Sequence, residues 1–114
     1  MLIVEDNELN LDLLVQILEE DYVLLVARDG VEAVRLAASE HPDLVLMDIA
    51  LPVMDGFEAA RRIHRAAPGV PIIGLSSHAM PEDAAFAPER GCSDYLTKPL
   101  DEDLLLARVR ALLK

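Results

Sequence analysis

The sequence predicts an α/β protein with a doubly wound, five-stranded parallel sheet and helices on both faces. Short apolar runs alternate with amphipathic stretches along the whole chain, which indicates repeated β–α units with right-handed crossovers. Most of the runs are apolar throughout, as is typical of parallel strands covered on both sides. Polar side chains gather directly after these runs, at the edge where sheets of this kind bind ligands.

Each expected element has its own pattern. The strands are expected at residues 2–4, 23–27, 44–47, 72–75 and 95–97. Helices are expected where apolar residues recur at helical spacing, which gives four stripes: Leu11, Leu14, Val15 and Leu18; Val31, Val34 and Ala38, more weakly; Phe57, Ala60, Ile63 and Ala67; and Leu105, Val109 and Leu112.

Turn and cap residues agree with these boundaries. Asp29 and Asp55 each precede a glycine ahead of a helical stripe, and Asp55 forms a capping-box pattern with Glu58. Asp101 is expected to cap the last helix. The 114 residues fit one domain, 1–114.

Composition excludes several classes of protein. Hydrophobic residues make up 53% of the chain, which is enough for a core, yet no apolar run reaches the roughly 20 residues of a membrane span. The net charge of −11 argues against direct contact with nucleic acid or with an anionic membrane. The single cysteine, Cys92, and the lack of a signal-peptide pattern suggest a cytoplasmic protein.

The residues that follow the strands form a chemically coherent set. They are Glu5 and Asp6 after the first strand, Asp48 after the third, Ser76 and Ser77 after the fourth and Lys98 after the fifth. Three carboxylates without histidine or cysteine suit Mg²⁺ or Mn²⁺. A carboxylate can also act as a nucleophile towards phosphorus. Asn7-Glu8-Leu9-Asn10 stands where a dinucleotide or P-loop site would need glycines.

Each of these residues also has a purely structural interpretation. Glu5 and Asp6 could cap the first helix, the serines could form turns, and Asp48 or Lys98 could be a solvated strand end. Their joint occurrence at four strand ends favours a functional site instead.

With these residues in place, the chain resembles the receiver domains of response regulators over nearly its full length. The signatures are Leu2-Ile3-Val4-Glu5-Asp6-Asn7, Leu46-Met47-Asp48-Ile49, Leu51-Pro52-Val53-Met54-Asp55-Gly56 and Tyr95-Leu96-Thr97-Lys98-Pro99. The opening through Asn10 is most similar to single-domain cell-division regulators and to receivers of hybrid histidine kinases. The resemblance implies a flavodoxin-like strand order, 2-1-3-4-5.

The resemblance also implies a metal site beside a phosphoacceptor. Asp48 would take the phosphoryl group and would also be a ligand of the metal. Asp6 would bind the metal directly, Glu5 would bind it through a water molecule, and the backbone carbonyl of Ala50 would be a further ligand. The catalytic partners of Asp48 would be Ser76 and Lys98, and the peptide bond between Lys98 and Pro99 would be cis.

The remaining implied roles concern switching and output. Ser76 and Tyr95 would be the switch pair, and His78 would either modify the dephosphorylation rate or be a solvated loop residue. The donor would be a phosphohistidine of a histidine kinase or phosphotransfer protein. Output would reach a downstream protein through the face of the fourth helix, fifth strand and fifth helix. The chain would be a free-standing regulator or one domain of a larger protein, with self-catalysed phosphotransfer and autodephosphorylation as its only chemistry.

Two departures from the family pattern and two alternative functions accompany this interpretation. Glu5 replaces a more common aspartate, and Pro88 falls within the expected fourth helix, residues 81–90, at a cost of roughly 3 kcal/mol to a regular helix.

A receiver-fold interaction module that is not phosphorylated would be expected to lack Asp48 or Lys98, but both are present. An aspartate-nucleophile phosphatase would have a second acid where Ala50 stands.

Overall fold

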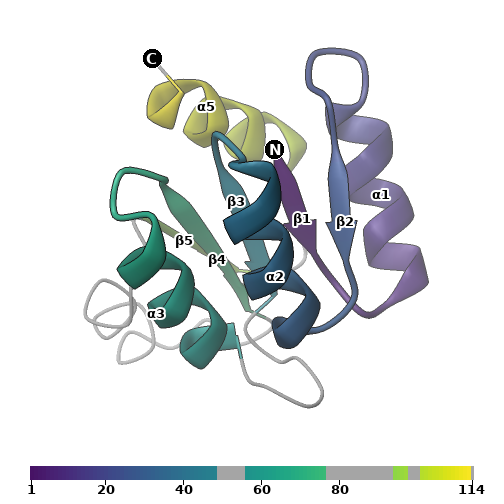
Figure 1. The fold of residues 1–114 in the computed structure, drawn as a ribbon. Helices are drawn as coiled ribbons and strands as arrows, with labels where there is room; N and C mark the ends of the chain where they lie inside the picture. Colours follow the sequence, from purple (N-terminus) through teal and green to yellow (C-terminus); the bar gives the residue numbers. More distant parts are fainter. Residues whose placement is uncertain (49–55, 77–93, 98–100, 114) are drawn as a thin grey trace.

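Five parallel strands form one sheet in the computed structural model, which describes residues 1–48, 56–76, 94–97 and 101–113 (Figure 1). The strands are β1 (Leu2–Val4), β2 (Leu25–Ala27), β3 (Val45–Asp48), β4 (Ile72–Ser76) and β5 (Asp94–Thr97). Their order is β2-β1-β3-β4-β5, and each neighbouring pair is parallel. The predicted fold class and strand order are therefore confirmed.

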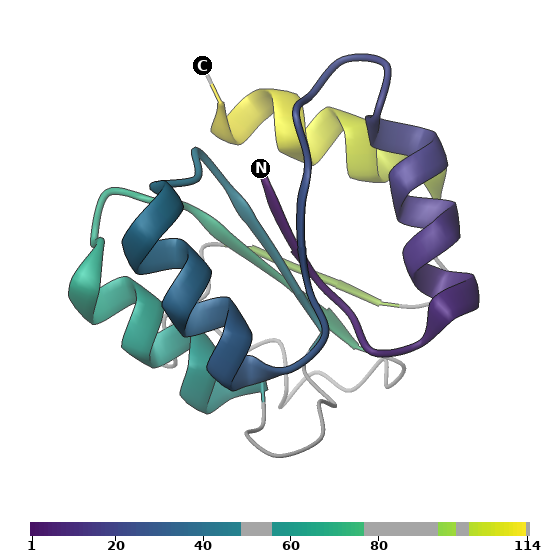
Figure 2. The same cartoon turned by 45° about the vertical axis from the view of Figure 1, so that its right-hand side comes forward.

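The described helices cover both faces of this sheet. They are α1 (Glu8–Leu18), α2 (Gly30–Glu40), α3 (Gly56–Ala66) and α5 (Glu102–Leu112). Helices α1 and α5 lie on one face and α2 and α3 on the other (Figures 1 and 2).

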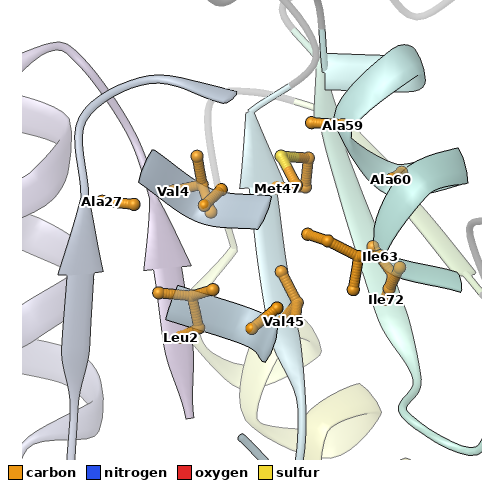
Figure 3. Packing of buried hydrophobic residues seen from close by; sticks show 11 residues of the cluster. Leu2, Val4, Ala27, Val45, Met47, Ala59, Ala60, Ile63 and Ile72 are labelled. Atoms are coloured by element: carbon orange, nitrogen blue, oxygen red, sulfur yellow. The ribbon is translucent and has the colours of Figure 1, made fainter. Parts of the chain in front are cut away.

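Two hydrophobic cores result from this layering, because successive residues of a strand point to opposite faces. Leu2 and Val4 pack under α2 and α3, whereas Ile3 packs under α1 and α5. Figure 3 shows Leu2, Val4, Val45 and Met47 on the side of the sheet that α3 covers. Both faces of the strands are buried, which explains why the strands are apolar throughout.

Side-chain caps begin three of the helices close to the strand ends. The amide of Glu32 donates to Asp29 Oδ1 at 2.8 Å, and the amide of Leu104 donates to Asp101 Oδ1 at 3.1 Å, so both predicted caps are confirmed. Asn7 caps α1 by accepting from the amide of Asn10 at 3.1 Å. The alternative in which Glu5 or Asp6 caps this helix is therefore wrong. The capping box predicted at Asp55 lies outside the described residues.

The predicted buried stripe of α2 is wrong by one position. Val31 is 52% exposed and Ala38 is also exposed, while Val34 is only partly buried. The residues that α2 buries are small: Gly30, Ala33 and Ala37. Small residues let the helix lie close to the strands beneath it, so size complementarity rather than hydrophobicity selects the inward face.

Strand β2 is shorter than predicted, because it begins at Leu25 and not at Val23. Val23 is 86% exposed, and its carbonyl accepts a hydrogen bond from the terminal ammonium of Met1 at 3.0 Å. Pairing of β2 with β1 begins only where Leu25 meets Leu2.

Within the described ranges, no helix combines the length and apolar character needed to cross a membrane. The expected fourth helix at residues 81–90, with Pro88, lies outside the described residues, and so does Cys92.

Candidate functional site

Three acidic side chains meet at the carboxyl edge of the sheet. Glu5 and Asp6 directly follow β1, and Asp48 ends the adjacent strand β3, where Val4 pairs with Met47. One carboxylate oxygen from each acid lies within 4.8 Å of the other two. The sequence prediction that these three residues share one site is confirmed by this geometry.

The acids differ in burial and in how they are held. Glu5 is fully buried and Asp48 is only 5% exposed, whereas Asp6 is exposed to solvent. The Glu5 amide donates to the carbonyl of Ala27 in β2 at 3.0 Å. The amide of Asn7 donates to Glu5 Oε2 at 3.3 Å. Both β2 and the start of α1 therefore fix Glu5.

The donor set fits a hard divalent cation. Charged carboxylates at this separation repel one another, and burial of two of them strengthens the repulsion because solvent screens it less. A cation between them would convert repulsion into attraction. Oxygen donors without nitrogen or sulfur suit Mg²⁺ or Mn²⁺, with water molecules completing an octahedron.

Two further predicted site residues, Ser76 and Tyr95, lie in β4 and β5, the strands that continue the sheet beyond β3. Asp48 pairs with Leu75 of β4, so the backbone of Ser76 lies one residue further along the neighbouring strand. Ser76 in turn pairs with Thr97 of β5, and Tyr95 pairs with Gly74. The other predicted residues lie outside the described part of the chain: Ala50, Ser77, His78, Lys98 and Pro99.

Sequence reasoning missed one pair of residues at this edge. Arg28 directly follows β2, and its Nη1 atom lies 2.7 Å from Oε1 of Glu8 in the first turn of α1. The rule that strand ends carry polar functional residues would have drawn attention to Arg28.

The fold and the acidic cluster together define a class of protein. A doubly wound sheet in the order β2-β1-β3-β4-β5 is a flavodoxin-like α/β fold, and in this chain its carboxyl edge offers three carboxylates that could hold a metal ion. Sequence comparison specifies the family, because residues 1–110 match the response regulator receiver domain. The chain belongs to this family, and it is a receiver domain of two-component signalling.

Relatives of this chain include both short and long regulators. Protein PilH of Pseudomonas aeruginosa is 37% identical over 116 residues, covering 99% of this chain and 96% of PilH. The polar-differentiation response regulator DivK of Brucella ovis is 34% identical, covering 99% of this chain and 94% of DivK. The response regulator PleD of Caulobacter vibrioides is 39% identical, but the match covers only 25% of PleD.

Solved receiver structures superimpose closely on the chain. A CheY-like receiver from Methanospirillum hungatei has a TM-score of 0.91 at 34% identity, covering 98% of this chain and 90% of that one. The receiver domain of the sensor histidine kinase PA1611 from Pseudomonas aeruginosa has a TM-score of 0.90 at 35% identity, covering 98% and 94%. That structure has a magnesium ion coordinated in its active-site cleft.

Proposed function

We propose that Asp48 is the phosphoacceptor of this receiver domain and that it acts beside a bound divalent cation. The observation that carries the proposal is the arrangement of Glu5, Asp6 and Asp48 at the carboxyl edge, where one carboxylate oxygen of each residue lies within 4.8 Å of the other two. Asp48 is 5% exposed and sits at the end of a central strand, so its position is tightly defined. A rigidly placed carboxylate is well suited to in-line attack on phosphorus.

In this proposal each residue has a distinct task. An oxygen of Asp48 attacks the phosphorus of the donor, and the bond from phosphorus to the donor histidine breaks, with that nitrogen keeping the electron pair. Asp6, Asp48 and the carbonyl of Ala50 would hold Mg²⁺ or Mn²⁺ directly, and Glu5 would hold it through a water molecule. When bound, the cation supplies neutralisation of the charge on the transferred group.

Lys98 and Ser76 complete the proposed site. Lys98 pairs with Asp48 and then with a phosphoryl oxygen, and the Ser76 hydroxyl turns towards the new group. Ser76 belongs to β4, which borders β3, and this position supports its role. Tyr95 of β5 moves with it, so the change reaches the face that includes β5 and α5.

The partners follow from the family. Receiver domains interact with histidine kinases and with downstream targets, and we propose a phosphohistidine of a kinase or phosphotransfer protein as the donor here. We also propose that the chain acts in the cytoplasm, as one receiver unit spanning residues 1–114. Water hydrolyses the acyl phosphate and resets the domain.

The direct test is phosphorylation by acetyl phosphate with Mg²⁺, followed by intact-mass measurement. We expect one phosphoryl adduct on the wild-type chain and none on Asp48→Asn. The matched control is Asp43→Asn, which makes the same chemical change just before β3, at the opposite end of the same strand. It should be phosphorylated like the wild type. An adduct that persists in Asp48→Asn would refute the assignment.

The same experiment separates the alternative functions. A phosphatase would turn over many phosphate esters rapidly, although it would lack the usual second acid because Ala50 occupies that position. An interaction module that is not phosphorylated would show no adduct with any small phosphodonor.

A further inference from the structure

An ion pair bridges the two chain segments that border the acidic cluster. Arg28 Nη1 lies 2.7 Å from Glu8 Oε1. Arg28 immediately follows β2, and Glu8 is the first residue of α1, two positions after Asp6. The pair therefore connects the residue after β2 to the end of the segment that leads from β1 into α1.

Both ends of this ion pair rest on firmly held backbone. On one side, Ala27 accepts the amide of Glu5 at 3.0 Å and Asp29 caps α2. On the other side, Asn7 caps α1. Helices α1 and α2 cover opposite faces of the sheet (Figure 2). The pair therefore links the first turn of α1 to the short segment that leads from β2 into α2.

Asp6 lies within the segment that the pair holds, and it needs such support. Its side chain is exposed and forms no hydrogen bond or ion pair with any residue in the described ranges. Among the described residues, the course of the backbone from Glu5 to Glu8 is therefore what sets where its carboxylate lies. Glu5, in contrast, is buried and hydrogen-bonded.

We propose that Arg28 and Glu8 are positioning residues that hold Asp6 in its metal-binding location and thereby raise the affinity for the divalent cation. This inference rests on the cation site of the proposed function, but it does not require that Asp48 be phosphorylated. The pair is solvent-exposed, with side chains 53% and 73% exposed. Exposed pairs contribute modest coupling, which corresponds to roughly a two- to five-fold change in affinity.

The sign of the effect distinguishes positioning from simple electrostatics. Arg28 is positive and Glu8 is negative, so long-range charge effects alone predict opposite outcomes when each is removed. Losing Arg28 would remove repulsion of the cation and tighten binding, whereas losing Glu8 would weaken it. Positioning predicts that both losses weaken binding, because either one breaks the same bridge.

The experiment is calorimetric titration of the metal-free chain with Mg²⁺ at fixed ionic strength. The variants are Arg28→Ala, Glu8→Ala, the double variant and the reversed pair Arg28→Glu with Glu8→Arg. We expect each single variant to weaken binding roughly two- to five-fold, the double variant to lose no more than one single variant, and the reversed pair to recover affinity. Hydrogen exchange should be faster in the turn from Glu5 to Glu8 in both single variants.

Matched controls make the same charge changes away from the bridge. Arg35→Ala alters an exposed arginine of α2, and Glu20→Ala alters an exposed acid beyond the other end of α1; neither residue forms an ion pair among the described residues. Both should bind Mg²⁺ with the affinity of the wild type. Tighter binding by Arg28→Ala, or an unchanged affinity in both single variants, would overturn the inference while leaving the proposed function intact. A wild-type chain that binds no Mg²⁺ would overturn both.

Discussion

The exposed member of the acidic cluster offers a clean test of the repulsion inferred at the site. Replacing Asp6 with asparagine removes one charge and leaves a side chain of the same shape, and no ion pair with a described residue is lost. Two unit charges 4.8 Å apart repel by about 0.9 kcal/mol in water, and Asp6 faces two other carboxylates within that distance. Allowing for salt, we expect the metal-free variant to be about 1 kcal/mol more stable than the wild type.

For a chain of this size, that gain should raise the metal-free melting temperature by about 4 °C. The assay is thermal unfolding with chelator and then with millimolar Mg²⁺. Mg²⁺ should stabilise the wild type because it binds only the folded cluster, and it should not stabilise Asp6→Asn. Asp43→Asn controls for the general relief of charge in a chain of net charge −11. The reasoning fails if Asp6→Asn is less stable than the wild type without metal, or if it keeps the full Mg²⁺ effect.

Three further changes test local structure. Asp29→Ala should cost about 1 kcal/mol in urea unfolding, because it removes the cap of α2; no loss would contradict this role. His41→Gly should stabilise the chain by up to about 1 kcal/mol, because His41 has a left-handed conformation with φ 50° at the end of α2; a loss of stability would show that its side chain matters more. Hydrogen bonds from Arg61, and to a lesser extent from Arg62, hold the pKa of Glu58 below its ordinary value. The contribution of ionised Glu58 to the stability of the fold is therefore complete above its unfolded-state pKa, and it is lost as the pH falls through its folded-state pKa. An NMR titration should find a low midpoint that rises in Arg61→Gln.

The sequence predicted the layered fold because its signals are local and redundant. Runs that are apolar throughout identify strands buried on both sides, and caps such as Asp29 and Asp101 mark where helices begin. The acidic cluster was also predictable, since the carboxyl ends of adjacent parallel strands must lie at one edge. Burial of Glu5 and Asp48 is consistent with that rule.

Features that depend on packing partners were harder to predict. The inward face of α2 is chosen by close approach to the sheet, which favours Ala33 and Ala37 over the larger Val31. The ion pair between Arg28 and Glu8 joins residues 20 positions apart in the sequence. The local sequence around either residue does not indicate that the other is its partner. Such long-range pairs become visible only when the strand order and helix starts are placed in space.

Anomalous diffraction from crystals grown with Mn²⁺ would test the central claim most directly. If the carboxylates that follow β1 and end β3 form a cation site at the nucleophile, the difference map will contain one strong peak in contact with Asp6 and Asp48. A map without a peak at this edge of the sheet, or with the ion bound away from Asp48, would contradict the account.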